Sequence, residues 1–518
     1  MTWQPELDDL ADRRAAAAEL GGDERVARHH AAGKLTVRQR IDGLVDPGSF
    51  AEIGSVAGFA QYSEDGRRTA FTPANFVLGD AAIDGRPVVV AGDDFTVRGG
   101  AADASIWEKL VHAEQRARRL RVPIVRLVDG SGGGGSVKSY HDLGRTYVPP
   151  LPGWRDQMEM LSEVPVVAAA LGSVAGLGAA RVAGSHLAVM VDGTSQVFVA
   201  GPPIVAYATH EDLEKEDLGG AGIHGRNGTV DLVVESEAEA FAAARRFLSF
   251  LPRSVWEMPP VIEAGDDPNR SEEALLDAIP RNRRQIYDGR RIIEMVVDHD
   301  SFFEIGARWG RALVTGFARL DGHPIGVLGA DPRIAGGVLS ADGAQKLRRF
   351  VDLCDTFHLP VVNFVDQPGF AVGSKAEQAS TIRHGAAAIA ALYQMRIPYF
   401  VVILRRTFGV AGAAMVDAGE PHLRVAWPSG DWGSLPLEGG IEAAFKRRLA
   451  EADEPDSLRN ELLAGFEAVR SPFRTAEAFD IEEIIDPRAT RPILCRWVNT
   501  VWATLAHDLG PKGRGYRP

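Results

Sequence analysis

The chain contains two copies of one sequence pattern, and this repeat limits its possible folds more than any other feature. Asp-Gly-Arg-Pro at 84–87 returns as Asp-Gly-His-Pro at 321–324, and the positions of Gly85 and Gly322 differ by 322 − 85 = 237. The same offset separates Gly99-Gly100 from Gly336-Gly337 and Val128-Asp129 from Val365-Asp366. Short strings recur by chance, but a constant offset across several of them is not expected from chance. We therefore expect two homologous domains in tandem.

Apolar segments rich in β-branched residues alternate with helical segments in both copies. The predicted strands include 88–91, 124–128, 166–171, 187–191 and 399–404, and residues 106–120 have a helical pattern. This alternation favours an α/β architecture with mostly parallel strands. A stretch rich in proline and aspartate at 257–284 has the composition of a linker. We expect an N-terminal domain at 1–256, a linker at 257–284 and a C-terminal domain at 285–518.

Composition excludes several classes of protein. The 518 residues carry a net charge of -13, which argues against a nucleic-acid surface, although local arginines could still bind an anion. Two cysteines cannot form a disulfide framework or a zinc motif, and they fit a cytoplasmic location. The adjacent His29 and His30 would face different directions on a helix, so no metal site is expected. The polar N-terminus and the interrupted apolar run at 164–191 predict neither a signal peptide nor a membrane span.

Glycine-rich segments follow three of the predicted strands. The segment 129–136, which contains Gly132 and Gly133, could be a flexible linker or a loop whose backbone approaches a ligand closely. The small-residue strings at 172–180 and 405–414 occupy matching places, because the positions of Gly176 and Gly409 differ by 409 − 176 = 233 and those of Pro165 and Pro398 differ by the same amount. Such turns could serve close helix packing. They could also form an oxyanion hole, in which backbone N–H groups stabilise negative charge on a carbonyl oxygen.

Six further strings, in this order and at these spacings, are typical of one enzyme family. They are Gly33-Lys34-Leu35-Thr36, Asp94-Phe95-Thr96-Val97, Leu218-Gly219-Gly220-Ala221, Pro368-Gly369-Phe370, Ala426-Trp427-Pro428 and Ile485-Asp486-Pro487-Arg488. With them, nearly the whole chain resembles the carboxyltransferase (β) subunit of biotin-dependent acyl-CoA carboxylases, such as the propionyl-, acetyl- and methylcrotonyl-CoA carboxylases.

The resemblance implies two tandem crotonase-like domains, each a ββα superhelix of the ClpP/crotonase type. The N-terminal domain would bind acyl-CoA and the C-terminal domain biotin, and the enzyme would move a carboxyl group from carboxybiotin to the α-carbon of the acyl-CoA through an enolate. It places the N–H groups of Gly176 and Leu177 on the enolate oxygen and those of Val410 and Ala411 on the biotin ureido oxygen. The implied substrate-binding residues are Gly132, Gly133, Ala175, Gly178, Gly409, Gly412 and Ala413.

The resemblance also implies partners. Neither an ATP-grasp biotin carboxylase nor an Ala-Met-Lys-Met biotinyl motif is present, so biotin would be carried by a separate biotin carboxylase/biotin carboxyl carrier subunit. The site would form between facing subunits of a homo-oligomer, a hexamer in this family. Coenzyme A would enter as part of the substrate, and no metal is implied.

Three departures from the family pattern leave other functions open. Leu177 and Val410 stand where the family usually has glycine, and the segment 430–440 lacks the usual Met-Gly turn. One alternative is a biotin-independent acyl-CoA decarboxylase, or a carboxyltransferase that uses another acceptor. Another is a non-catalytic assembly subunit.

Overall fold

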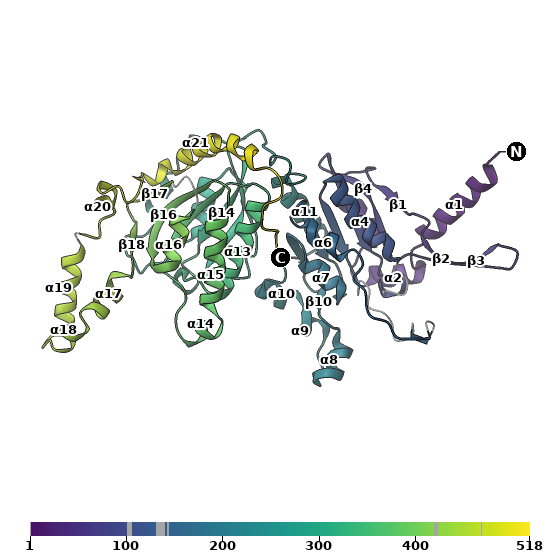
Figure 1. Ribbon diagram of the computed structural model, residues 1–518, viewed down its shortest axis with the longest axis horizontal. Coiled ribbons are helices and arrows are strands. Elements are labelled where there is room, and N and C mark those ends of the chain that lie inside the picture. The colour runs from purple at the N-terminus through teal and green to yellow at the C-terminus, as the bar shows by residue number, and fades with distance from the viewer. Residues whose placement is uncertain (1, 101–105, 131–139, 142–143, 419–422, 468) are drawn as a thin grey trace. The chain divides into compact units, whose positions relative to one another are not determined.

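The structure is a computed structural model that describes residues 2–100, 106–130, 140–141, 144–418, 423–467 and 469–518 (Figure 1). The chain forms two compact units. Unit 1 comprises Met1–Glu257 together with Gly510–Pro518, and unit 2 comprises Met258–Leu509.

Unit 1 is built on a seven-stranded sheet. Its strand order is β1 (Ala51–Ile53), β4 (Phe76–Ile83), β5 (Arg86–Asp93), β6 (Ile124–Val128), β7 (Val166–Ala170), β9 (Leu187–Val191) and β11 (Leu232–Val234). Strand β4 is antiparallel to both of its neighbours, β1 and β5. The strands β5, β6, β7, β9 and β11 are parallel to one another. Every residue of β6, β7 and β9 is buried, as expected for parallel strands covered on both faces.

Helices and two short strand pairs complete unit 1. The helices are α1 (Gln4–Ala18), α2 (Asp23–Ala31), α3 (Val37–Leu44), α4 (Trp107–Leu120), α6 (Trp154–Met160), α7 (Leu177–Ala183), α8 (Pro202–Thr209), α9 (Lys215–Gly219), α10 (Ala221–Asn227) and α11 (Glu237–Phe250). The strand pairs are β2 (Gly58–Tyr62) with β3 (Arg68–Pro73), and β8 (Ser173–Ala175) with β10 (Gln196–Phe198). A capping box starts α3: Gln39 N–H donates to Thr36 Oγ1, and Thr36 N–H donates to Gln39 Oε1.

Unit 2 repeats this sheet strand for strand. Its order is β12 (Phe303–Glu304), β13 (Leu313–Leu320), β14 (His323–Ala330), β15 (Val361–Gln367), β16 (Tyr399–Phe408), β17 (Arg424–Ala426) and β19 (Glu483–Ile484), with β18 (Asp431–Gly433) paired to the end of β16. The first two pairs are again antiparallel and the others parallel. The common strand order and direction confirm the tandem repeat predicted from the sequence.

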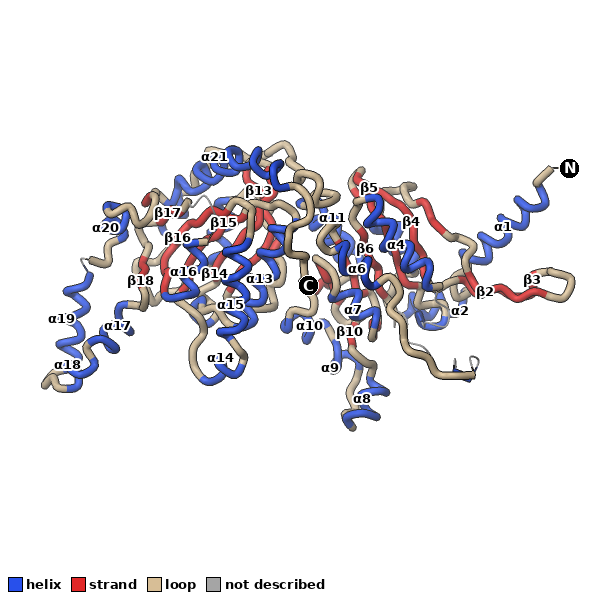
Figure 2. The backbone as a smooth tube through the Cα atoms, viewed as in Figure 1, coloured by secondary structure: helices blue, strands red, loops and turns tan. Residues whose placement is uncertain are grey.

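Helices of unit 2 lie beside its sheet, except those within residues 437–467, which extend away from it (Figure 2). They are α12 (Gly289–Val296), α13 (Ala341–Thr356), α14 (Ser374–Gln378), α15 (Thr381–Gln394), α16 (Gly409–Asp417), α17 (Leu437–Ala444), α18 (Lys446–Ala450), α19 (Pro455–Glu467), α20 (Pro472–Glu477) and α21 (Thr490–Trp502). Helix α13 packs against α15, and α21 packs on the sheet through Trp497, whose ring centre is 5.3 Å from that of Phe400. Burial of large aromatic rings is a main source of stability in such a core.

Two segments belong to a different part of the structure from the one that was expected from the sequence. Most of the stretch 257–284, expected to be a linker, belongs to unit 2, where Arg270 donates to the carbonyls of Met295 and Val297. The tail at 510–518, grouped with the C-terminal domain in the sequence analysis, belongs to unit 1. There the Tyr516 N–H donates to Ser162 Oγ at 2.9 Å, so the tail is fixed by a backbone hydrogen bond that its composition does not reveal.

Candidate active site

The first small-residue turn lies at the end of β8. Strand β8 pairs in parallel with β10, and Gly176 follows it with φ 58 and ψ -117. Helix α7 begins at the next residue, Leu177. A left-handed backbone favours glycine because a Cβ atom is strained there, so Gly176 makes the sharp change from strand to helix possible. Leu177 is a helical residue and needs no left-handed conformation.

The backbone N–H groups of this turn are not equivalent. The Gly176 N–H donates to Phe198 O at 3.1 Å, so this donor is already used within the chain. Within the described residues, no acceptor is recorded for the N–H groups of Leu177 or Gly178, which lie in the first turn of α7. The geometry therefore disfavours Gly176 as an oxyanion donor and leaves Leu177 and Gly178 available.

The second turn has the same construction in unit 2. The last residues of β16 pair in parallel with β18, and Gly409 follows with φ 62. Val410 is helical and 65% exposed, whereas Ala411 is buried. Within the part of the chain that the structure describes, the N–H groups of Val410 and Ala411 have no recorded acceptor. The valine that departs from the family pattern therefore does not occupy the left-handed position, which remains glycine.

A cavity of about 390 Å³ lies beside this second turn. Gly409 and Ala413 line it from α16, and Trp432 of β18 lines it from the segment that departs from the family pattern. Thr407, which is 6% exposed, also lines it, and its Oγ1 has no hydrogen-bond partner among the described residues. Gly412 is not among the lining residues, but a Cβ there would lie 2.9 Å from the Thr407 carbonyl carbon, so close packing explains this glycine. The cavity can therefore hold a small molecule with a polar group.

Four other residues were predicted to bind substrate in unit 1. Ala175 and Gly178 lie next to the first turn. Gly132 and Gly133 lie outside the described residues. The last described residue before them, Gly130, accepts a hydrogen bond from the Ala175 N–H at 3.3 Å. The start of that segment is therefore tied to the turn that follows β8.

Sequence analysis missed a buried ion cluster around Asp129. Arg40 Nη1 donates to Asp129 Oδ2 at 2.9 Å, and Lys34 Nζ lies 3.4 Å from Oδ1. Arg40 also forms two hydrogen bonds with Glu237, at 2.9 and 2.8 Å, and donates to Leu171 O. These contacts hold together the ends of β6 and β7, from which the glycine-rich segments emerge.

A second missed cluster surrounds Asp366 in unit 2. Arg405 donates to it at 2.9 Å, Arg406 donates at 2.7 Å, and the Tyr287 hydroxyl donates at 2.9 Å. Burial alone would raise the pKa of Asp366, but the hydrogen bonds and charges of Arg406 and Arg405 outweigh burial and lower it. In the sequence, these two clusters could have been recognised from an aspartate that recurs at the same place in both repeats, Asp129 and Asp366.

No metal centre or membrane helix is evident in the described ranges. No group of three or more His, Cys, Asp or Glu side chains there could hold a metal ion. In the same ranges, no helix has both the length and the apolar character needed to cross a membrane.

Comparisons with known proteins show the family to which the chain belongs. Residues 28–515 match the carboxyl transferase domain family. The propionyl-CoA carboxylase carboxyltransferase subunit of Haloferax mediterranei is 32% identical over 499 residues, covering 95% of each chain. The methylmalonyl-CoA decarboxylase subunit alpha of Veillonella parvula is 30% identical over 522 residues, covering 100% of this chain and 99% of the relative. The crystal structure of transcarboxylase 12S, with methylmalonyl-coenzyme A and methylmalonic acid bound, has a TM-score of 0.87 at 29% identity and covers 100% and 97% of the two chains.

Two crotonase-like α/β domains, each with a glycine turn at a helix start, define an acyl-CoA carboxyltransferase. The chain belongs to the carboxyl transferase family. It is the carboxyltransferase component of an acyl-CoA carboxylase, which confirms the class of enzyme expected from the sequence.

Proposed function

We propose that the enzyme transfers a carboxyl group from carboxybiotin to the α-carbon of propionyl-CoA and forms methylmalonyl-CoA. The substrate is suggested by relatives named for propionyl-CoA or methylmalonyl-CoA in three different types of enzyme. The observation that carries the proposal is the matched pair of turns at Gly176 and Gly409. Each turn starts a helix whose first N–H groups have no acceptor within the described chain.

In unit 1, the thioester oxygen of the acyl-CoA would accept hydrogen bonds from the N–H groups of Leu177 and Gly178. Removal of a proton from the α-carbon places negative charge on that oxygen, and one such donor lowers the barrier by about 3 kcal/mol. Gly176 would set the shape of the turn through its bond to Phe198, and Ala175 would border the substrate. Gly132 and Gly133 remain expected substrate-binding residues from the sequence.

In unit 2, the N–H groups of Val410 and Ala411 would hold the biotin ureido oxygen. The observations that fit a biotin ring are the cavity of about 390 Å³, these two N–H groups and the Thr407 hydroxyl, which has no partner among the described residues. Gly409 and Ala413 would border the ring. When bound, carboxybiotin supplies the activated carboxyl group.

Partners and assembly belong to the same proposal. Biotin would be carried by a separate biotin carboxylase/biotin carboxyl carrier subunit, and the chain would form a cytoplasmic hexamer. Transcarboxylase 12S, its structural relative, is a hexamer assembly. Helix α8 projects from the rest of unit 1 (Figure 1). It supports an oligomer because none of its residues is buried, and Ile204 and Tyr207 are 62% and 87% exposed. Exposed apolar surface of this kind marks interaction sites.

A second candidate function is the decarboxylation of methylmalonyl-CoA. It is favoured by the relative from Veillonella parvula, which the chain matches over its full length. The two functions differ in whether biotin must accept the carboxyl group.

The test is to incubate the purified chain with methylmalonyl-CoA and free biotin, and to follow CoA esters by mass spectrometry. Release of propionyl-CoA that requires biotin supports the proposed function. Release at the same rate without biotin supports the decarboxylase. A chain that binds methylmalonyl-CoA without turnover would contradict both.

A further inference from the structure

Arg126 is a fully buried arginine in the middle of strand β6. Its neighbours in the strand are isoleucine, leucine and valine, and its own side chain is 0% exposed. The Arg126 Nε and Nη2 each donate to Glu114 of α4 at 2.9 Å. A buried ion pair stabilises a fold only when further hydrogen bonds compensate for the loss of water. The contacts of the third nitrogen therefore show what this pair holds in place.

That third nitrogen, Arg126 Nη1, donates to two backbone carbonyls at the end of helix α7. They are Arg181 O at 3.0 Å and Gly184 O at 2.8 Å. Arg181 lies in the last turn of α7, and Gly184 is its C-cap. The last carbonyls of a helix have no partner within the helix, and a cation there is favourable. Because α7 has 7 residues and is only about 10 Å long, a bond that fixes its end also fixes its start at Leu177.

The side chain of Arg181 extends the same cluster. Its Nη1 lies 3.5 Å from Asp93 Oδ1, and its Nη2 lies 3.9 Å from Glu114 Oε1. Asp93 Oδ2 accepts a hydrogen bond from the Asp129 N–H at 3.1 Å. The cluster thus consists of two arginines and two acidic side chains, all of them buried. It joins α7 to α4, to the end of β5 and to the residue that follows β6.

Unit 2 supports the equivalent helix from the same strand position. Asn363 of β15 corresponds to Arg126, since 363 − 126 = 237. The Asn363 Nδ2 donates to the Tyr399 hydroxyl at 2.7 Å, and this hydroxyl donates to Met415 O at 2.8 Å, near the end of α16. This support contains no ion pair. What recurs in the two units is therefore a strand residue that fixes the end of the helix that begins at a glycine turn.

We propose that Arg126, oriented by Glu114, is a positioning residue of the reaction. By fixing the end of α7 it would hold the N–H groups of Leu177 and Gly178 at hydrogen-bonding distance from the thioester oxygen. This inference rests on the proposed function of those two N–H groups. An oxyanion donor must lie about 2.7–3.1 Å from the oxygen, so a small shift of α7 weakens the transition state more than it weakens binding of the CoA ester.

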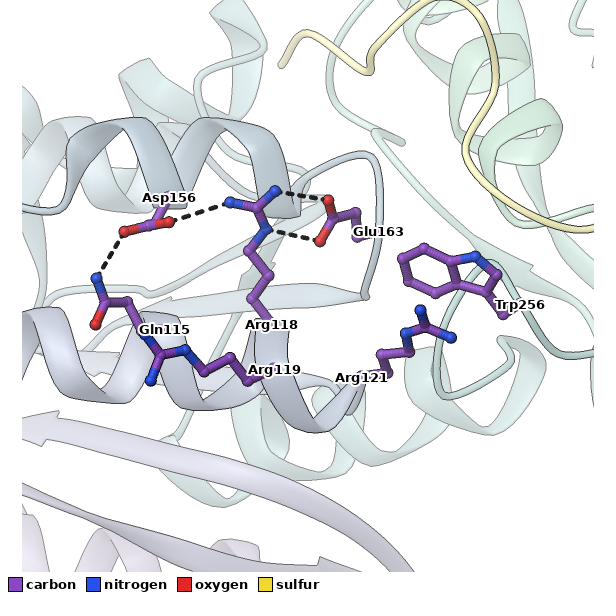
Figure 3. Close-up of a pocket in the computed structure, with 7 residues that line it drawn as sticks. All are labelled: Gln115, Arg118, Arg119, Arg121, Asp156, Glu163 and Trp256. Carbon is purple, nitrogen blue, oxygen red and sulfur yellow. Dashed lines mark hydrogen bonds and ion pairs between the residues drawn. The ribbon is translucent and has the colours of Figure 1, made fainter.

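The test compares two matched double variants of the full-length protein. E114Q/R126M removes both charges of the pair, so neither partner is left as an unpaired ion. The control R118M/E163Q makes the same exchange in another pair of α4. Arg118 donates to Glu163 at 2.8 and 2.9 Å, but its third contact, at 3.1 Å, is Asp156 of α6 (Figure 3). Circular dichroism and thermal melting verify that each variant is folded at the assay temperature.

Arg126→Lys is a second, milder variant. Lysine keeps the buried positive charge, but it lacks the planar fork that reaches Glu114 and both carbonyls at once. We expect its activity to lie between those of the wild type and E114Q/R126M.

Two measurements separate positioning from general stability. The first is kcat and KM for biotin-dependent release of propionyl-CoA from methylmalonyl-CoA. In E114Q/R126M we expect kcat to fall roughly tenfold or more while KM changes by less than about twofold, and we expect little change in the control. The second is hydrogen–deuterium exchange of the peptide that contains α7, followed by mass spectrometry. This exchange should become faster in E114Q/R126M and not in the control.

Combination with L177P tests how the effect reaches the reaction. Once the N–H of residue 177 is absent, its misplacement has no further cost. The combined loss in kcat should therefore be smaller than the product of the separate losses. Losses that multiply, equal losses in the control, or unchanged exchange of α7 in E114Q/R126M would each overturn the proposal.

Failure of the proposed function gives a different result. Release of propionyl-CoA by the wild type at the same rate without biotin contradicts carboxyl transfer. That reaction still places negative charge on the thioester oxygen, so the same variants are then compared in it. A wild type without any turnover overturns the role of Arg126 in the reaction, even where the exchange measurement shows that Arg126 fixes the helix.

Discussion

Asp129 and Asp366 occupy the same position in the two repeats, since 366 − 129 = 237. The cations that neutralise their charges nevertheless come from different elements of the chain. Arg40 of α3 and Lys34 reach Asp129, whereas Arg405 and Arg406, which lie within β16, reach Asp366. Both carboxylates are fully buried. The repeat thus preserves the buried anion at the end of the strand while its cations come from different elements.

This difference predicts unequal effects of Asp366→Asn and Asp129→Asn. Loss of the Asp366 charge leaves Arg405 and Arg406 without an anionic partner among the described residues, and such a broken buried pair costs about 3–5 kcal/mol. Asp129→Asn should cost less, because Arg40 keeps both bonds to Glu237. Urea unfolding of each full-length variant measures the two costs, and a smaller cost for Asp366→Asn would contradict the account.

Leu177→Pro tests the oxyanion role of the first turn. Proline is accepted at the first position of a helix, so it removes the N–H of residue 177 with little strain. We expect kcat for carboxyl transfer to fall by roughly 100-fold, the effect of losing one oxyanion donor. Leu177→Ala keeps the N–H group and should retain most activity. Equal activity of the two variants would exclude Leu177 N–H as a donor.

Val410→Pro applies the same test to the second turn. Its side chain is 65% exposed and follows Gly409, so the substitution removes an N–H with little loss of packing. Transfer from methylmalonyl-CoA to free biotin should fall by roughly 100-fold while binding of methylmalonyl-CoA stays unchanged. Val410→Ala is the matched control. Weaker CoA-ester binding in the proline variant would indicate that unit 2 contacts the acyl-CoA.

Lys109 should make stability depend on pH in a defined window. Burial lowers its pKa from 10.5 to about 8, and its Nζ donates to Gly54 O at 3.1 Å. Between these values the unfolded chain binds more protons than the folded one, so stability rises with pH. Relative to Lys109→Met, the wild type should therefore gain up to about 1.4 kcal/mol per pH unit above pH 8. Urea unfolding of both proteins from pH 7 to pH 10 measures this gain, and a constant difference would contradict it.

The anchoring of α16 can be tested with Tyr399 and Asn363. The buried Tyr399 hydroxyl donates to Met415 O at 2.8 Å and accepts from Asn363 Nδ2 at 2.7 Å. Tyr399→Phe leaves the Met415 carbonyl and the Asn363 amide poorly paired, at a cost of roughly 1–3 kcal/mol. A double-mutant cycle with Asn363→Ala should be non-additive, because both changes remove the same hydrogen bond. Additive losses in urea unfolding would show that the two residues act independently.

Local patterns in the sequence were sufficient to predict much of the fold. Residues 124–128 and 187–191 form strands with the predicted bounds. Runs of buried apolar residues and helix caps depend on neighbours in the sequence, so they can be read without a structure. The positions of both glycine turns were predictable for the same reason.

The tertiary structure decided which groups at those turns are available and what surrounds them. The Gly176 N–H is used by the carbonyl of Phe198, at the end of β10, because β10 pairs with β8. Arg40 reaches Asp129 from a distant part of the chain, and the tail at 510–518 joins unit 1. Hydrogen-bond and ion-pair partners from distant segments leave no local periodicity in the sequence. The sequence by itself therefore determined the repeat, the strands and the turns, whereas only the folded chain determined which donors are available and which charges are paired.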